Sequence, residues 1–297
     1  YCINIQYIGK TVMSSYAELH CLSNFTFFLC ASHPAALVHQ AYALGYRALA
    51  LTDECSISGV VRAHVAAREL GLQLIIGSEF TLNNGDKFVL LVANKNGYRQ
   101  LTRLITLARR RAPKGEYHLT IDDLRAKSLS DCLSLVVCDP SPTPMERKHA
   151  KFQAISDHGK RFKSLMPNRV WLTLEQPGYG TDECHQRSLE ALSENLEIPI
   201  VATGNVHMHC RARQPLQDTL TAIRHQKSIL NIKHCLAANA ERHLRSKKIL
   251  KHLYPNAALN NSIQIAGQCH FSLDELNYQY PSELIPDGLS ATQYLRQ

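Results

Sequence analysis

The segment ALALTDECSISGVVRAHVAARELGLQLII, residues 48–76, decides the fold of this 297-residue chain. Its first apolar run, Ala48–Leu51, predicts a buried strand, and residues 58–70 predict an amphipathic helix that ends at Gly71. A second buried strand is predicted over residues 72–76. A strand, a helix and a strand in this order predict a pair of parallel strands joined by a crossover helix.

The same alternation continues on both sides of this segment. Further strands are predicted at residues 16–20, 88–93, 133–138, 170–174 and 198–202, and helices at 34–44, 96–108, 120–127, 145–158 and 181–196. Six or seven strands with intervening helices indicate an α/β fold with a parallel sheet. A closed or nearly closed (β/α)7 barrel of the triosephosphate-isomerase kind fits this pattern, and a doubly wound open sheet is the alternative. We favour the barrel.

The C-terminal part has a different pattern. No strand is predicted after residue 211, and helices are predicted at residues 215–224, 240–253 and 256–269, followed by a Pro- and Gly-containing linker at 279–288. Because the first methionine is Met13, residues 1–12 are interpreted as an upstream extension. The predicted domains are therefore the barrel at 13–228 and a helical connector with its linker at 229–297.

Composition and charge limit the function classes. With 45% hydrophobic and 20% charged residues, no apolar run near ~18 residues and no leader pattern, the chain is expected to be a soluble cytoplasmic protein with reduced thiols and no membrane partner. The net charge is +8, and residues 205–252 contain ten Lys and Arg against only Asp218 and Glu241. This concentration of positive charge permits contact with a polyanion.

Four polar residues follow predicted strands and are expected to meet at one end of the barrel. They are His20, Asp53, Glu79 and His207. In parallel barrels the functional groups lie just past the C-terminal ends of the strands. Two imidazoles and two carboxylates form a set suited to Zn²⁺ or Mn²⁺, which could activate water for phosphoester hydrolysis. The alternative is ordinary polarity at the strand ends.

Basic clusters are candidates for contact with nucleic acid. Helical spacing over residues 240–253 would place Arg242, Arg245 and Lys248 on one face, and the run 109–111 with Lys114 could also grip phosphates. A solvated helix face is the alternative for both clusters. No phosphate-binding loop, dinucleotide fingerprint or Gly-x-Ser-x-Gly elbow is present.

Several segments resemble a known family. Residues 15–28, 48–61, 75–80, 201–213, 216–223, 239–245 and 271–276 are similar to the N-terminal polymerase-and-histidinol-phosphatase (PHP) domain of bacterial error-prone DNA polymerases, damage-inducible relatives of the DNA polymerase III alpha subunit. The resemblance covers residues 13–297. It implies a PHP-type barrel and a DNA-directed DNA polymerase, a nucleotidyltransferase, that serves translesion synthesis, damage-induced mutagenesis and DNA repair.

The resemblance also implies a multi-metal site in fully equipped members, and this chain departs from it. His20, Asp53, Glu79 and His207 match the family's ligands. Other positions hold residues that differ from the pattern, namely Leu22, Glu54, Lys87, Pro177 and Asn205. Because leucine and proline cannot ligate and asparagine is neutral, we expect an incomplete cluster. At most a weakly held Zn²⁺ or Mn²⁺ and weak or absent hydrolysis are expected.

Polymerases of this family use acidic palm residues that hold two Mg²⁺ ions. The chain contains no Asp-x-Asp sequence, so it is expected to be a fragment without catalytic residues for polymerisation. DNA, deoxynucleoside triphosphates and proteins of the damage response are the partners that the resemblance implies. A stand-alone metal-dependent phosphoesterase and a scaffold that binds DNA or partners through residues 211–251 remain the alternatives.

Overall fold

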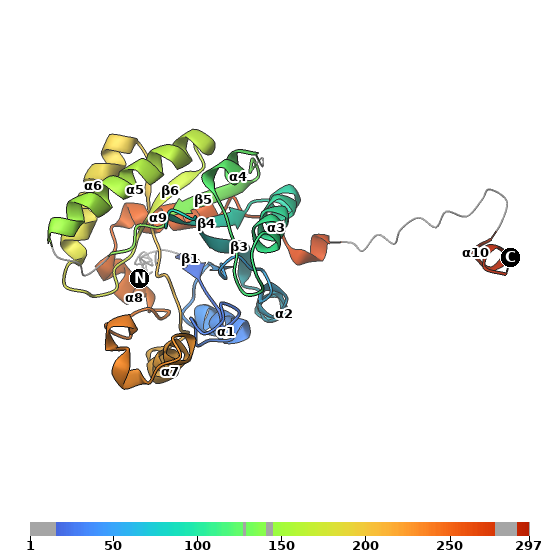
Figure 1. Cartoon of the computed structure of the whole chain (residues 1–297), viewed down its shortest axis with the longest axis horizontal. Coiled ribbons are helices and arrows are strands. Elements are labelled where there is room, and N and C mark those ends of the chain that lie inside the picture. The colour runs from blue at the N-terminus through green and yellow to red at the C-terminus, as the bar shows by residue number, and fades with distance from the viewer. Residues whose placement is uncertain (1–15, 127–128, 141–144, 277–289, 297) are drawn as a thin grey trace, which may run out of the picture.

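Seven strands form one sheet that curls into a nearly closed barrel (Figure 1). The computed structural model describes residues 16–126, 129–140, 145–276 and 290–296. Within these residues the strands are paired in chain order: β1 (Ala17–Cys21), β2 (Ala48–Leu51), β3 (Gln73–Thr81), β4 (Lys87–Val92), β5 (Cys132–Val136), β6 (Val170–Leu174) and β7 (Ile200–Ala202).

The barrel closes between its first and last strands. An isolated parallel bridge joins Cys21 to Val206. The Leu22 N–H donates to the Val206 carbonyl at 2.9 Å, and the Val206 N–H donates to the His20 carbonyl at 2.9 Å. These bonds bring the end of β1 beside the segment that follows β7, which confirms the prediction of a nearly closed α/β barrel.

The prediction of an all-parallel sheet is wrong for one strand. β4 pairs antiparallel with both β3 and β5. Only residues 82–86 separate β3 from β4, whereas a parallel connection needs a crossover of about a dozen residues or more. The chain therefore turns in a hairpin, with Gly85 at a φ of 90°. As a result Lys87, the first residue of β4, lies at the end of the barrel where β3 ends.

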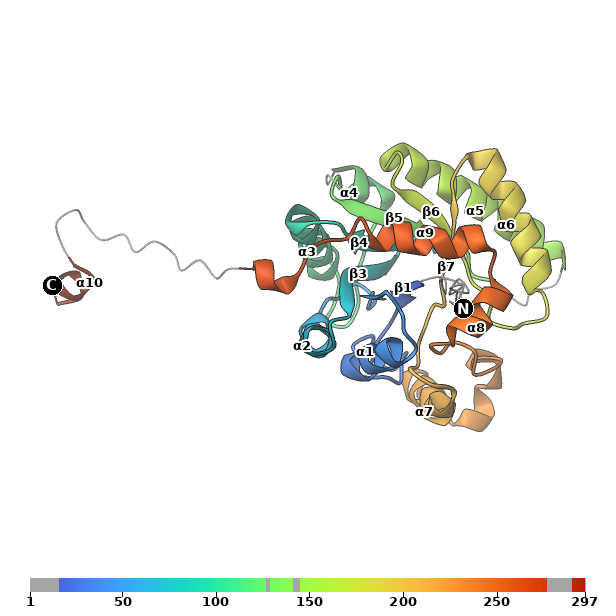
Figure 2. The same ribbon diagram turned by 180° about the vertical axis from the view of Figure 1, so that it is seen from behind.

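Helices surround the strands on the outside (Figures 1 and 2). In chain order, the helices between the strands are α1 (Pro34–Ala43), α2 (Val60–Leu70), α3 (Lys95–Arg110), α4 (Ile121–Ala126), α5 (Met145–Leu165) and α6 (Asp182–Leu196). The C-terminal part adds α7 (Gln214–Arg224), α8 (Lys247–Leu253), α9 (Asn256–Ala266) and α10 (Ala291–Tyr294), with short 3₁₀ turns at Arg211–Arg213, Ile229–Asn231, Lys233–Cys235 and Leu273–Glu275.

The core has two layers that alternate along the strands. Leu49 and Leu51 belong to the layer between the strands and the helices, whereas Ala48 and Ala50 belong to a separate inner cluster. Ile265, at the end of α9, also belongs to the inner cluster, and α9 packs against β1 and β7 (Figure 2). The predicted connector thus contributes part of the packing of the barrel, and a domain boundary at residue 228 stays a prediction.

The helix predicted at residues 240–253 begins later than expected. Ser246 caps it by accepting a hydrogen bond from the Ile249 N–H, so α8 begins at Lys247. The preceding segment forms an isolated bridge between His243 and Met208. The predicted extension at 1–12 and the predicted linker at 279–288 lie outside the described residues.

None of the described helices has the length and apolar character needed to cross a membrane.

Candidate functional site

His20 lies at the barrel mouth, the end where all strands except the antiparallel β4 finish. Its Nε2 is 2.7 Å from Glu79 Oε2, and its Nδ1 is 3.6 Å from Glu175 Oε1, which is an ion-pair contact longer than a hydrogen bond. All three side chains are buried. Burial lowers the pKa of His20, but the two carboxylates, Glu175 and Glu79, outweigh it and raise that pKa to about 9. At neutral pH an imidazolium therefore sits between two carboxylates.

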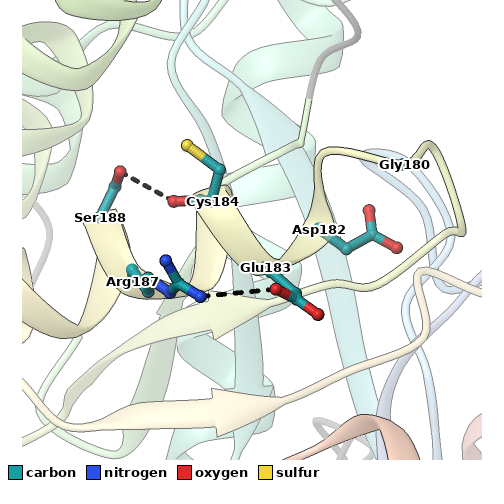
Figure 3. A pocket seen from close by; sticks show the side chains of 6 residues that line it. All are labelled: Gly180, Asp182, Glu183, Cys184, Arg187 and Ser188. Atoms are coloured by element: carbon teal, nitrogen blue, oxygen red, sulfur yellow. Dashed lines mark hydrogen bonds and ion pairs between the residues drawn. The ribbon is translucent and has the colours of Figure 1, made fainter.

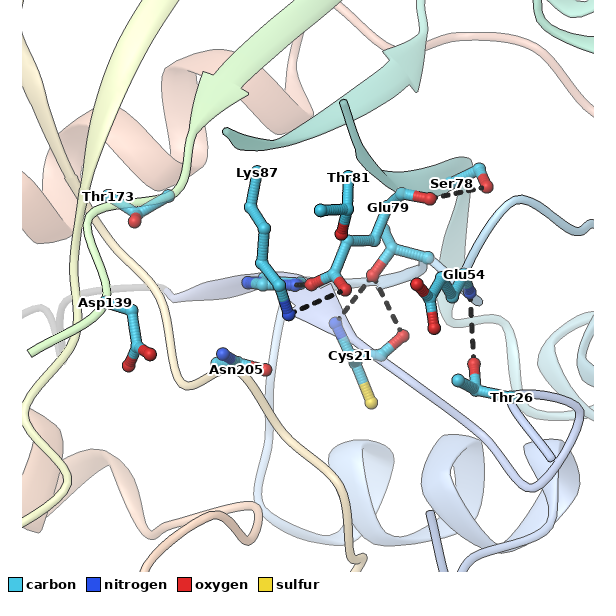
Figure 4. Close-up of polar contacts among 12 residues, drawn as sticks. Cys21, Thr26, Glu54, Ser78, Glu79, Thr81, Lys87, Asp139, Thr173 and Asn205 are labelled. Atoms are coloured by element: carbon cyan, nitrogen blue, oxygen red, sulfur yellow. Dashed lines mark hydrogen bonds and ion pairs between the residues drawn. The ribbon is translucent and has the colours of Figure 1, made fainter. Parts of the chain in front are cut away.

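Two further cations bind the outer oxygens of these carboxylates. Lys87 Nζ is 3.6 Å from Glu79 Oε1, and Figure 4 shows these two side chains pointing toward each other. On the other side Arg242 contacts Glu175 Oε2 at 3.8 Å and Asp139 Oδ1 at 3.2 Å. We call these six residues the mouth network: Lys87, Glu79, His20, Glu175, Arg242 and Asp139.

The ionisation of the network follows from these contacts. Burial raises the pKa of Glu79, but the hydrogen bond from His20 and the charge of Lys87 outweigh it and lower that pKa to about 2. Burial lowers the pKa of Arg242, whereas Glu175 and Asp139 raise it, and the net change is upward. His20, Glu79 and Arg242 are therefore each held in the charged form by their neighbours.

Asp53 lies at the mouth as predicted, but its carboxylate holds a loop. Its Oδ1 accepts hydrogen bonds from the Ser23 N–H at 2.7 Å and the Thr26 hydroxyl at 2.9 Å, and its Oδ2 accepts from the Ser23 hydroxyl at 2.8 Å. Burial raises the pKa of Asp53, and these hydrogen bonds oppose the rise. Both oxygens are thus engaged by the segment that follows β1.

His207 contacts the mouth network through Asn205. Its Nε2 is 3.0 Å from Asn205 Oδ1, and the Asn205 amide donates to Glu175 Oε2 at 3.1 Å. An amide that donates through its nitrogen presents its oxygen to His207, so Nε2 of the ring carries the proton. Burial and the nearby charge of Arg242 lower the pKa of His207, which keeps the ring neutral. This protonated nitrogen cannot ligate a metal.

The structure brings His20 and Glu79 into direct contact and leaves Asp53 and His207 engaged elsewhere at the same mouth. Sequence reasoning missed Glu175 and Asp139 as members of this site. Glu175 follows β6 directly, so the strand-end rule that selected Glu79 would also have found it. Arg242 has no such signal, because it comes from an irregular segment far along the chain.

The residues present do not fit the metal cluster that the resemblance implies. Across the described parts of the chain, no group of three or more His, Cys, Asp or Glu side chains is placed to hold a metal ion. The Nε2 of His20 faces Glu79, and Lys87 and Arg242 hold carboxylate oxygens that a metal would need.

The basic residues predicted to share one helix face do not do so. Arg245 is buried before α8, where its guanidinium donates to the Gln176 carbonyl at 2.9 Å and the Glu241 carbonyl at 2.8 Å. Arg242 belongs to the mouth network, and Lys248 is exposed on α8. The prediction of a common face is wrong, because Ser246 starts the helix after Arg242 and Arg245.

A separate hollow lies at the start of α6 (Figure 3). Arg187 and Glu183 form an ion pair there at 3.5 Å, with both side chains at least 80% exposed. Pairs this exposed contribute little to stability. None of the predicted site residues lines this hollow, whose lining is Gly180, Asp182, Glu183, Cys184, Arg187 and Ser188.

Comparisons with known proteins agree with this architecture. The model of the PHP domain family matches residues 18–176. The chain is 48% identical over 282 residues to an error-prone DNA polymerase of Methylococcus capsulatus, covering 95% of this chain and 26% of that protein. It is 46% identical over 288 residues to an error-prone DNA polymerase of Dechloromonas aromatica, covering 96% of this chain and 27% of that protein. The chain thus spans about a quarter of the length of these relatives.

Solved structures show a more distant likeness. An amidohydrolase of Chromobacterium violaceum matches with a TM-score of 0.45 and 14% identity, covering 65% of this chain and 88% of the other. A two-domain protein of Bacteroides vulgatus, described as containing a predicted PHP-like metal-dependent phosphoesterase, matches with a TM-score of 0.41 and 16% identity, covering 84% of this chain and 63% of the other.

Proposed function

Because the chain belongs to the PHP domain family, we propose that it is the PHP portion of an error-prone DNA-directed DNA polymerase. Identities of 46–48% to such polymerases over 95–96% of this chain support the proposal. The proposal includes translesion synthesis and DNA repair in the cytoplasm, with DNA and deoxynucleoside triphosphates as substrates and Mg²⁺ as the cofactor of the complete enzyme. Polymerisation by residues 1–297 alone is not expected, because the chain contains no Asp-x-Asp sequence.

The proposed role of the barrel itself is structural, and the mouth network is the observation that carries it. Glu79, Glu175 and Asp139 supply three negative charges, and Lys87, Arg242 and the protonated His20 supply three positive ones. The six residues of the mouth network therefore carry no net charge without a divalent ion. Removing one member would leave an uncompensated buried charge, which is strongly destabilising. Lys87 and Arg242 thus act as built-in cations in place of bound metal.

The alternative is a metal-dependent phosphoesterase, which would use His20, Asp53, Glu79 and His207. Retention of these residue types favours it. Their engagement with Glu175, Ser23, Lys87 and Asn205 argues against it, because a metal would have to displace all of these contacts. Any Zn²⁺ or Mn²⁺ held here would therefore be weakly bound.

Hydrolysis and metal content test this choice together. The purified chain, dialysed against Mn²⁺ or Zn²⁺, is expected to contain substoichiometric metal and to hydrolyse p-nitrophenyl phosphate no faster than a His20→Ala variant. Stoichiometric metal that disappears in His20→Ala, together with hydrolysis that disappears in the same variant, would establish the phosphoesterase. The polymerase proposal is tested by primer extension with the native polypeptide that carries this segment, which is expected to extend a primer and to have a mass several times 33.4 kDa.

A further inference from the structure

We propose that the outer face of α3 binds the phosphodiester backbone of nucleic acid through a row of three arginines: Arg99, Arg103 and Arg110. All three are exposed. The inference rests on the proposed function only for the identity of the polyanion, because the charge and geometry of the row come from this chain alone. The row is separate from the mouth network and from the basic residues predicted at 242–248, and it shares only Arg110 with the predicted basic run 109–111.

Helical geometry places the three arginines in one line. At 3.6 residues per turn, Arg103 lies about 40° and Arg110 about 20° around the axis from Arg99. The buried residues of α3 include Leu104 and Ala108, which lie on the opposite side of the helix. The row therefore points directly away from the barrel. Its length along the axis is about 16 Å, at ~1.5 Å per residue.

Within the part of the chain that the structure describes, none of the three guanidinium groups forms an ion pair. No carboxylate pairs with any of them there, and residues 95–115 contain no Asp or Glu at all. The neighbouring arginines differ. Arg109 turns inward and donates to the carbonyls of Glu54 and Cys55, and Arg111 binds Asp123 at 2.6 Å. Arg109 and Arg111 thus have partners within the fold, whereas the positive charges of Arg99, Arg103 and Arg110 are not neutralised by a described carboxylate.

A polyanion matches this row better than a single anion does. Like charges four residues apart on a helix repel each other, so Arg99 and Arg103 destabilise an isolated helix slightly. Successive nucleotides of one strand rise about 3.4 Å along duplex DNA, so a row of about 16 Å spans roughly five of them. Arg103 and Arg110 of the row also line a hollow with Thr102, Thr106, Leu107 and Arg111. The two threonine hydroxyls donate to carbonyls of α3 itself, so the arginines are the cationic donors of this surface.

Fluorescence anisotropy with a labelled 20-nucleotide single strand, over a range of salt concentrations, tests the inference. The variant Arg99→Gln/Arg103→Gln/Arg110→Gln is compared with Lys160→Gln/Arg187→Gln/Lys227→Gln, which removes the same charge from exposed positions elsewhere. The α3 variant is expected to bind at least tenfold more weakly at low salt. Its slope of log K against log[salt] is expected to be shallower by about 2, because each phosphate contact to a single strand contributes about 0.7. The control variant is expected to keep the original slope.

An equal loss of DNA affinity in both triple variants would show that only net charge matters. An unchanged slope of log K against log[salt] in the α3 variant would show that α3 makes no contact with the DNA. Either result overturns the inference. Loss of binding to phosphatidylserine vesicles with unchanged DNA binding would also overturn it, by assigning the row to a membrane. None of these results affects primer extension by the native polypeptide, so failure here is distinguishable from failure of the polymerase proposal. Circular dichroism of each variant is the control for correct folding.

Discussion

Lys87 Nζ lies 3.6 Å from Glu79 Oε1 because the hairpin of β3 and β4 makes the two residues diagonal neighbours. Glu79 is paired with Val89, and Lys87 is two residues before Val89 on the same face of β4. Diagonal neighbours in an antiparallel pair are about 7–8 Å apart at Cα, within reach of a lysine side chain. The antiparallel direction of β4 thus places the Lys87 ammonium beside the carboxylate of Glu79 at the barrel mouth.

The pKa of His20 predicts how stability changes with pH. Its folded value of about 9 exceeds the ordinary 6.5, so the stabilisation is fully present below pH 6.5 and is lost as pH rises through about 9. Urea unfolding at pH values from 6 to 10 should show the free-energy difference between the wild type and His20→Gln shrinking, by ~1.4 kcal/mol for each unit of pKa shift. A difference that stays constant over this range would contradict the charged state assigned to His20.

Gly204 is predicted to tolerate no side chain. A Cβ at this position would lie 2.7 Å from Glu18 Oε2 and 2.8 Å from Val206 Cγ2, and the Gly204 N–H donates to both oxygens of Glu18. Gly204→Ala is expected to lower the free energy of unfolding by ~1–3 kcal/mol, as crowding in a packed site does. The control is Gly267→Ala, whose Cβ would meet its nearest atoms at 3.4 Å. Equal melting temperatures for the two variants would refute the close contact at Glu18.

Replacing Arg245 is predicted to lower the free energy of unfolding, whereas replacing Lys248 is predicted to leave it nearly unchanged. Arg245→Ala leaves the buried carbonyl of Gln176 and the partly buried carbonyl of Glu241 without their Arg245 donors, so a loss of ~1–3 kcal/mol is expected in thermal or urea unfolding. Lys248→Ala changes an exposed side chain and is expected to stay within ~0.5 kcal/mol. If Arg245→Ala kept full stability but lost DNA binding, Arg245 would regain the role that the sequence suggested.

Much of the barrel could be predicted from sequence because each strand is a short apolar run. The predicted ranges 48–51 and 170–174 coincide with β2 and β6. The direction of β4 could not be deduced from hydrophobic pattern alone, since a buried strand has the same pattern in either direction. The predicted strand also ended at residue 76, whereas β3 continues to Thr81, so the short hairpin connection of residues 82–86 was not apparent from the predicted ranges.

The candidate site was predictable only in part. The strand-end rule located His20 and Glu79, which do meet, and it would have located Glu175. It could not locate Lys87, because a parallel β4 would have put that residue at the opposite end of the barrel. Arg242 reaches the mouth from a segment without regular structure, so no periodicity indicates its position. Its contacts with Glu175 and Asp139 depend on tertiary packing.

The most direct test of the built-in cations is thermal unfolding with and without metal. The wild type, Lys87→Gln, Arg242→Gln and the exposed control Lys248→Gln are each melted in EDTA and in Mn²⁺. We predict that the wild type and the control melt at the same temperature in both solutions, and that Lys87→Gln and Arg242→Gln melt lower in EDTA and regain part of the loss in Mn²⁺. Wild-type unfolding that shifts upward with Mn²⁺, or mouth variants that melt like the control, would contradict the account.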